Sequence, residues 1–175
     1  MADESRNPLV SNFTIRRASE RDAAAILSVL EVVAAERIYS AVDRVWALDQ
    51  ERTYLRSLSS REATHIAFSS SGEVLGFQTL DLWMAVVRSM EHVGQLGTFL
   101  LPSWRRCGVG RLLFQATLAF ARSSNYRKFV IQVRASNLSA QAFYKALGFV
   151  ECGRFAKQVI IDGIEDDEVL LEYFL

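Results

Sequence analysis

Hydrophobic and polar positions along the chain follow two different periods. Apolar residues spaced three or four apart predict helices over residues 20–36, 49–58, 108–124 and 137–147. Short alternating or continuous apolar runs predict strands over residues 13–16, 64–68, 74–83, 91–101, 128–134, 149–159 and 169–174. Ser19 and Asp22 form an acidic variant of a capping box before the first helix, and Gly148 stands where the last helix should end.

The order of these elements predicts the fold class. Turn-forming residues at 69–72 and 161–163 favour antiparallel pairing of the strands on either side. The helix over residues 108–124 lies between two strands, which favours one parallel pair. We therefore expect a mixed α/β fold with a twisted, mostly antiparallel sheet of about seven strands, flanked on both faces by about four helices. Residues 1–12 are interpreted as a polar lead and residues 13–175 as a single domain.

Composition excludes several classes of function. Half of the residues are hydrophobic, which indicates a packed interior. The 20 basic and 20 acidic side chains balance, whereas a general nucleic-acid binder shows a basic excess. No apolar run approaches the ~20 residues of a membrane span, and residues 1–12 lack the apolar segment of a secretory signal. We therefore expect a cytoplasmic protein that binds neither nucleic acid nor membranes.

The spacing of cysteine and histidine argues against a metal site. The only such residues are Cys107, Cys152, His65 and His92, and none of them forms a CxxC or HxxxH pair. We therefore expect two free thiols and no metal.

The segment at residues 102–113 carries the most informative chemistry. Gly108 and Gly110 stand where a strand gives way to a helix, and glycines allow a main chain to approach a ligand closely. The free amides of a first helical turn attract anions, and three arginines add positive charge: Arg105, Arg106 and Arg111. The segment suits a diphosphate, although a Gly-x-Gly at a helix start also allows tight strand–helix packing. It is neither a P-loop, because no Gly-Lys-Ser/Thr follows, nor a dinucleotide fingerprint, because Leu113 replaces the third glycine.

This segment resembles the signature of the GNAT acetyltransferase superfamily, Arg/Gln-x-x-Gly-x-Gly/Ala. Arg105, Gly108 and Gly110 fill that signature. A second landmark of the family follows at its usual spacing, with Asn137, Ala140, Phe143-Tyr144 and Gly148-Phe149. The resemblance is strongest over residues 94–153. The general outline is similar to the branch that includes phosphinothricin and amino-acid N-acetyltransferases.

The resemblance implies acetyl-CoA as co-substrate and no metal. The implied coenzyme contacts are Phe99, Leu100, Leu101, Arg105, Arg106, Cys107, Gly108, Val109, Gly110, Arg111, Asn137, Ala140 and Tyr144. The main-chain amide of Leu100, beside a strand bulge that is usual in the family, would polarise the thioester carbonyl. The Tyr144 hydroxyl would protonate the leaving thiolate. Two alternatives stay open: Asn137 as an N-cap and Tyr144 as an aromatic packed on the sheet. Cys107 lies in the phosphate turn and is not expected to be a nucleophile.

The acceptor side is less defined. Relatives often carry a glutamate about ten residues before the motif arginine as the base, but Gln95 occupies that position here. The remaining candidate bases are Glu36, Tyr39, Glu91, His92 or an ordered water. Acceptor contacts are expected from residues 36–46 and 81–84, with carboxylates at Glu36, Asp43 and Asp81 and apolar walls from Tyr39, Trp46, Trp83 and Met84. The acidic run at residues 165–168 is interpreted as a solvated turn.

The sequence therefore predicts an acetyl-CoA-dependent N-acetyltransferase. Its acceptor would be a primary amine of a small molecule, such as an amino acid or a polyamine, attacking directly in a ternary complex. The same donor site would serve a protein N-terminal or lysine acetyltransferase, or a regulatory domain that binds acetyl-CoA without turnover. A homodimer is also compatible, since dimers are common among the relatives, but the sequence shows no seam for one.

Overall fold

The computed structural model describes residues 13–175, so the polar lead interpreted at residues 1–12 lies outside the described residues. Strands of this range are β1 (Thr14–Arg17), β2 (Ala63–Phe68), β3 (Val74–Leu82), β4 (Val93–Leu100), β5 (Lys128–Arg134), β6 (Val150–Ile161) and β7 (Ile164–Phe174). Helices are α1 (Ala23–Ala35), α2 (Leu48–Ser57), α3 (Val109–Ser123) and α4 (Leu138–Ala146). None of these helices is long and apolar enough to cross a membrane.

All seven strands form one sheet in the order β1-β2-β3-β4-β5-β7-β6. Neighbouring strands pair antiparallel except β4 and β5, which are parallel. The predicted mixed fold with about seven strands and four helices is therefore confirmed.

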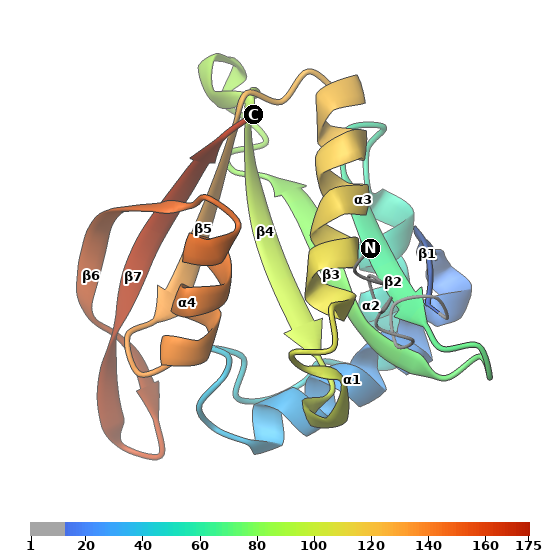
Figure 1. The fold of residues 1–175 in the computed structure, drawn as a ribbon, viewed down its shortest axis with the longest axis horizontal. Helices are drawn as coiled ribbons and strands as arrows, with labels where there is room; N and C mark the ends of the chain where they lie inside the picture. Colours follow the sequence, from blue (N-terminus) through green and yellow to red (C-terminus); the bar gives the residue numbers. More distant parts are fainter. Residues whose placement is uncertain (1–12) are drawn as a thin grey trace, which may run out of the picture.

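The parallel pair at the centre of the sheet is short. Residues 93–95 of β4 face residues 128–130 of β5, and the two strands then separate (Figure 1). On its other side β4 pairs with β3 in continuous register up to Leu100, so the bulge expected near Leu100 does not interrupt that ladder. The separation from β5, rather than a bulge, leaves the edge of residues 96–100 without a strand partner.

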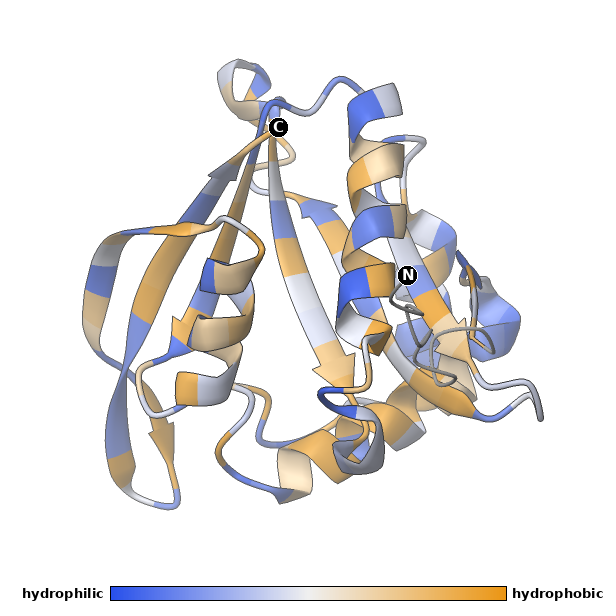
Figure 2. Ribbon diagram, in the orientation of Figure 1, coloured by the Kyte–Doolittle hydropathy of each residue, from blue (hydrophilic) through white to orange (hydrophobic). Residues whose placement is uncertain are grey.

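Helices cover both faces of the sheet. In Figure 1, α3 and α4 lie on the near face on either side of β4, and α1 and α2 lie behind. Alternation along the strands sorts their side chains between these layers: Leu80 and Leu96 pack toward α3 and α4, whereas Phe77 and Phe99 pack toward α1. The rings of Phe77 and Phe99 stack with centroids 4.9 Å apart. Figure 2 shows α1 as hydrophobic over most of its length, which suits a helix that packs against both the sheet and α2.

The first helix begins as predicted from its capping residues. The main-chain amide of Ser19 donates to the carboxylate of Asp22 at 2.8 Å. Arg16 adds two hydrogen bonds to the same carboxylate, at 2.9 and 2.7 Å. One turn of 3-10 helix, Glu20–Asp22, then leads into α1.

The interpretation of residues 165–168 as a solvated turn is wrong. The turn falls at Asp162 and Gly163, whose φ angles are +53° and +78°, and the acidic run belongs to β7. Basic residues of β5 and β6 neutralise it in three ion pairs: Lys157–Glu165, Arg134–Asp166 and Arg154–Asp167. Cross-strand charge pairing of this kind allows a charged run to form a strand.

Candidate active site

The turn between β4 and α3 presents a row of main-chain amides without acceptors. It ends at Gly108, the N-cap of the 15-residue helix α3, whose φ is +89°. Glycine suits that angle because a β-carbon would strain the main chain. Within residues 13–175, no group accepts a hydrogen bond from the amides of residues 106–111. Successive free amides at the positive end of a helix dipole form an anion site.

Gly110 has a different role from Gly108. A β-carbon at Gly110 would lie 3.1 Å from Cζ of Phe143 on α4 and 3.3 Å from Cδ1 of Leu100 on β4. The glycine therefore lets the first turn of α3 pack closely against both elements. A β-carbon at Gly108 would meet no described protein atom within 4 Å. Tight packing, the alternative interpretation of the motif, thus accounts for Gly110 but not for Gly108.

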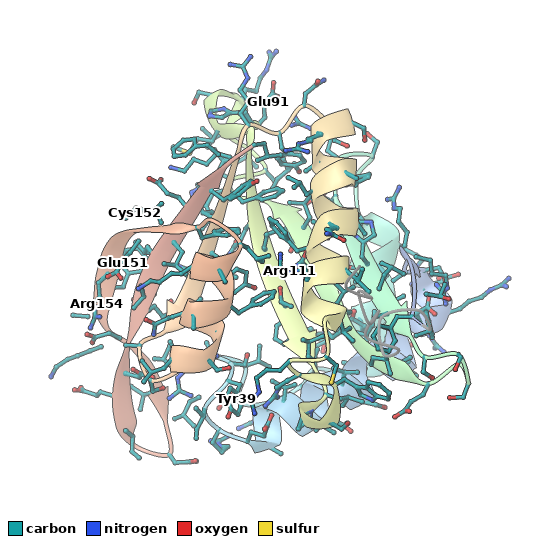
Figure 3. The ribbon with its side chains drawn as sticks, viewed as in Figure 1. Tyr39, Glu91, Arg111, Glu151, Cys152 and Arg154 are labelled. Carbon is teal, nitrogen blue, oxygen red and sulfur yellow. The ribbon has the colours of Figure 1, made fainter. Side chains whose placement is uncertain are left out.

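Arg105 joins the turn to the end of α1. Its guanidinium donates to both carboxylate oxygens of Glu36, with 2.9 Å for the Nη1–Oε1 pair, and to the main-chain carbonyl of Leu100 at 3.1 Å. It also lies 4.2 Å from the centre of the Tyr39 ring. Glu36 and Tyr39, which were expected to contact the acceptor, therefore brace the turn through Arg105. Figure 3 labels Tyr39 just beyond α1.

A cavity of about 560 Å³ opens beside this turn. Residues 98–100 of β4 form one wall, and the first turns of α3 and α4 form others. Arg106 and Arg111 also line it, and neither makes an ion pair with another residue that the structure describes. Figure 3 labels Arg111 between α3 and α4. The cavity thus combines free amides, unneutralised cations and a free strand edge.

Two residues of the α4 landmark have protein partners. Asn137 caps α4: its side-chain oxygen accepts from the amide of Ala140 at 3.0 Å, and its side-chain nitrogen donates to the carbonyl of Tyr39 at 3.1 Å. The N-cap interpretation of Asn137 is confirmed. Tyr144 is only 3% exposed, and its hydroxyl donates to Oγ1 of Thr98 at 2.7 Å. Burial raises the pKa of Tyr144, so this hydroxyl stays protonated at neutral pH.

A second cavity, of about 500 Å³, lies between α1 and α2 on one side and β3 and β4 on the other. Phe99 lines both cavities, so both lie against the end of β4. Glu51 of α2 and Asp81 of β3 place carboxylates along it, and no arginine, lysine or histidine is among its described lining residues. Burial raises the pKa of both carboxyl groups.

Each carboxylate of the second cavity is held by an aromatic donor. Nε1 of Trp46 donates to Glu51 at 2.7 Å, and the hydroxyl of Tyr54 donates to Asp81 at 2.7 Å. Gln95, which stands where a glutamate was expected, lies directly opposite Asp81 in the β3–β4 register. Opposite position 95, the neighbouring strand therefore carries a carboxylate.

Glu51 and Tyr54 were not among the residues predicted from the sequence. Their spacing from Leu55 and Leu58 places them on the apolar face of α2, so a charged side chain at position 51 had to be buried. Of the expected acceptor contacts, Asp81 and Trp46 line the second cavity. Three further expected contacts line neither cavity: Asp43, Trp83 and Met84.

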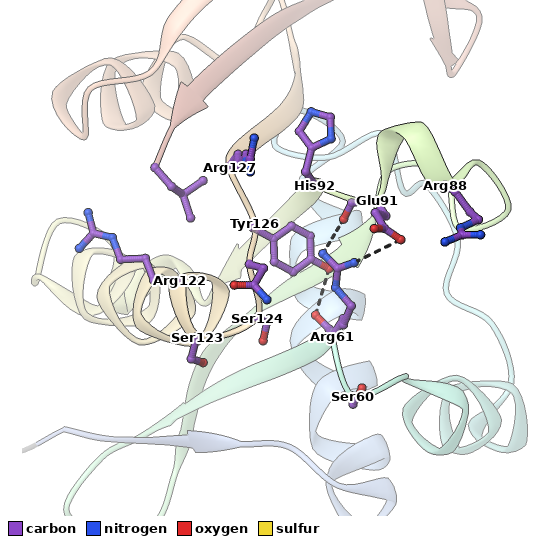
Figure 4. A pocket seen from close by; sticks show the side chains of 12 residues that line it. Ser60, Arg61, Arg88, Glu91, His92, Arg122, Ser123, Ser124, Tyr126 and Arg127 are labelled. Carbon is purple, nitrogen blue, oxygen red and sulfur yellow. Dashed lines mark hydrogen bonds and ion pairs between the residues drawn. The ribbon is translucent and has the colours of Figure 1, made fainter.

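A third cavity, of about 840 Å³, lies at the other end of β4 (Figure 4). Its lining is polar and includes Arg61, which donates to the carbonyl of Glu91 at 2.6 Å. Glu91 and His92, both considered as bases, line this cavity. The eight residues of β4 separate them from the glycine turn by about 25 Å, which places them outside a reaction at that turn.

The cysteines take no part in a cluster of metal ligands. Cys107 and Cys152 are both free thiols. Within residues 13–175 there is no group of three or more histidine, cysteine or acidic side chains that would hold a metal ion.

Comparisons with known proteins agree with this geometry. Residues 31–149 match the model of the acetyltransferase (GNAT) family. The chain is 32% identical over 150 residues to the aminoglycoside N(6')-acetyltransferase type 1 of Stenotrophomonas maltophilia, covering 83% of this chain and 92% of the relative.

Solved structures share the fold at lower identity. A candidate phosphinothricin N-acetyltransferase superposes with a TM-score of 0.86 at 20% identity, over 93% of this chain and 98% of that one. YncA of Salmonella typhimurium, a candidate acetyltransferase solved with its cofactor acetyl-CoA, has a TM-score of 0.85 at 18% identity, over 94% and 95% of the two chains.

Proposed function

The chain belongs to the GNAT family of acetyltransferases, and we propose that it transfers the acetyl group of acetyl-CoA to a primary amine of a small molecule. The family membership makes it an N-acetyltransferase with acetyl-CoA as co-substrate. The acceptor class and the residue roles below are inferred from the two cavities that Phe99 lines.

The donor site rests on one observation above all, the row of free amides at residues 106–111 beside the unpaired edge of β4. Diphosphate oxygens would accept hydrogen bonds from these amides, and Arg106 and Arg111 would neutralise their charge. Arg105 would act indirectly, by fixing the turn to Leu100. The pantetheine arm is an extended chain with amide groups, so it would pair with the main chain of residues 99–101 as an added strand.

The reaction follows from this placement. The amine nitrogen attacks the thioester carbonyl carbon, so a C–N bond forms while the C–S bond breaks and no acyl-enzyme is required. One proton of the ammonium passes to a carboxylate of the second cavity before the attack, directly or through water, and the second leaves the nitrogen as the amide forms and restores the proton that Tyr144 gives up. The Leu100 amide would stabilise the charge that develops on the carbonyl oxygen. The Tyr144 hydroxyl, held against Thr98, would return a proton to the thiolate.

The second cavity would hold the acceptor. Its volume of about 500 Å³ falls in the range of small-molecule sites. Glu51 and Asp81 would attract a cationic amine. Its apolar walls include Leu30, Trp46, Phe77 and Phe99. The relative from Stenotrophomonas maltophilia is named for acetylating an aminoglycoside, which carries several amines, and such an acceptor suits an acidic cavity.

An acetyl-CoA consumption screen tests the proposal. The purified chain is incubated with acetyl-CoA and, in turn, amino acids, linear polyamines, aminoglycosides and peptides. Thiol release measures turnover, and mass spectrometry identifies the acetylated amine. We expect turnover with at least one small amine, and turnover with peptides alone would contradict the proposed acceptor class.

Thermal denaturation with coenzyme A separates the remaining outcomes. Stabilisation by coenzyme A without transfer to any amine would instead assign a regulatory binding domain. No stabilisation at saturating coenzyme A would refute the donor site.

A further inference from the structure

Among the described residues, the carboxylates of the second cavity form no ion pair, unlike the carboxylates of Asp22 and Asp166. Asp22 pairs with Arg16 at 2.7 Å, and Asp166 pairs with Arg134 at 2.9 Å. Glu51 is 2% exposed, and its side chain accepts a hydrogen bond from just one described donor, the neutral indole of Trp46. A buried charge without an opposite charge is costly, so an acidic cavity of this kind is suited to a cationic ligand.

The carboxylates of Glu51 and Asp81 also line the same cavity. Glu51 enters from α2, and Asp81 enters from β3 at the opposite wall. They are close enough for the charge of Asp81 to raise the pKa of Glu51. A ligand with one cationic nitrogen would neutralise one carboxylate and leave the other unmatched. A ligand with two would neutralise both.

Apart from the polar side chains of Gln50, Thr79 and Gln95, the rest of the lining is mostly apolar, which favours an apolar spacer. Ile26 and Leu30 of α1 line the cavity together with aromatic rings, whereas Gly97 of β4 contributes no side chain. Hydrocarbon carbons of a ligand would therefore lie against apolar surface while its charged ends reach the acids. This arrangement matches a chain of methylene groups with an amine at each end.

We propose that the Glu51–Asp81 pair selects acceptors that carry two cationic nitrogens joined by a short apolar spacer. This inference rests on the proposed function, because it assigns the acceptor of the same site. The nitrogen nearer Phe99 is acetylated, and the other nitrogen stays bound as a cation.

Putrescine and pentylamine test this selection, because they differ only in a terminal amine that replaces a methyl group. The wild-type chain should have a kcat/KM for putrescine about 10- to 100-fold above that for pentylamine, the discrimination expected for one hydrogen-bonded charge. Cadaverine and hexylamine repeat the comparison with a longer spacer. A ratio near one in both pairs would overturn the proposal while leaving acetyl transfer itself intact.

Glu51→Gln and Asp81→Asn test the two carboxylates. Each amide keeps an oxygen that accepts from Trp46 or Tyr54, so each variant removes charge while preserving the hydrogen bond of the folded chain. We expect the diamine preference to fall toward one in both variants. Asp49→Asn, at a side chain of the same helix that is 90% exposed, serves as the control and should keep the wild-type ratio.

Binding without turnover distinguishes this inference from the proposed function. Putrescine alone should raise the Tm of the wild-type chain and of Asp49→Asn more than pentylamine does, and this difference should vanish in Glu51→Gln. A preserved diamine preference in Glu51→Gln would overturn the role of that residue. Absence of coenzyme A stabilisation in the wild-type chain would instead refute the proposed function.

Discussion

Replacing Gly108 with alanine separates strain of the main chain from contact with a ligand. Gly108 has a φ of +89°, and a left-handed main chain costs an L-residue roughly 1–2 kcal/mol. No described atom would lie within 4 Å of the new β-carbon, so overpacking adds nothing. For a chain of this size the strain corresponds to a decrease in Tm of about 2–8 °C. Because the free and bound states share this strain, it cancels from the Kd for coenzyme A.

The Kd of Gly108→Ala therefore reports what the β-carbon meets when coenzyme A is bound. In the proposed complex the diphosphate lies against the amides of residues 106–111, and a methyl group would hold it away from them. Losing one charge-assisted hydrogen bond costs roughly 1.5–3 kcal/mol, which weakens binding about 10- to 100-fold. Titration calorimetry with coenzyme A measures this change, and thermal scans measure the strain separately.

Gly72→Ala provides the matched control. Gly72 lies in the turn between β2 and β3 with a φ of +85°, and a β-carbon there also meets nothing described within 4 Å. The two variants should lose similar Tm, but only Gly108→Ala should lose affinity. If Gly108→Ala binds coenzyme A as tightly as Gly72→Ala does, the diphosphate does not lie at this turn.

Three further predictions concern single side chains. Tyr144→Phe removes the hydroxyl that donates to Thr98. We expect kcat to fall about 100-fold or more, while the Kd for coenzyme A changes much less. Unchanged turnover would exclude Tyr144 as the proton donor. Burial lowers the pKa of His65 from 6.5 to about 4. Between these pH values the unfolded chain binds a proton that the folded chain does not. The free energy of unfolding should therefore fall by up to ~3 kcal/mol as the pH drops from about 6.5 to 4. Urea unfolding across that range should show this slope, and His65→Gln should flatten it. Arg134→Met leaves Asp166 buried without its cation, so urea unfolding should show a loss of about 3–5 kcal/mol, and a loss below 1 kcal/mol would contradict a buried pair.

Much of the fold could be predicted from the sequence because its signals are local. Helical spacing and the Ser19–Asp22 capping box placed α1 within a few residues of its observed start. The start of β7 was missed for a physical reason: residues 165–168 are charged, and their partners at Arg134, Arg154 and Lys157 come from other strands. A charged run forms a strand only when the tertiary fold neutralises it.

The two halves of the site differ in how far they could be predicted from the sequence. The donor turn depends on glycines and main-chain amides that are consecutive in sequence, so its pattern is visible there. The proposed acceptor cavity depends on the register that places Asp81 opposite Gln95, and on the contact between Tyr54 and Asp81 across 27 positions. Neither relation is encoded by a local pattern: helical spacing could place Glu51 on the apolar face of α2, but not beside Asp81.

Arg105 shows how the donor and acceptor halves are held together. The guanidinium of the signature arginine donates hydrogen bonds to Glu36 and to the carbonyl of Leu100. Glu36 ends α1, and the segment that follows leads to Trp46, which holds a carboxylate of the acceptor cavity. The end of β4, the glycine turn and the end of α1 are thus joined by one cation whose side chain is 23% exposed. We infer that Arg105 is a positioning residue, because direct transfer requires the donor and the acceptor to be held in a fixed relative position.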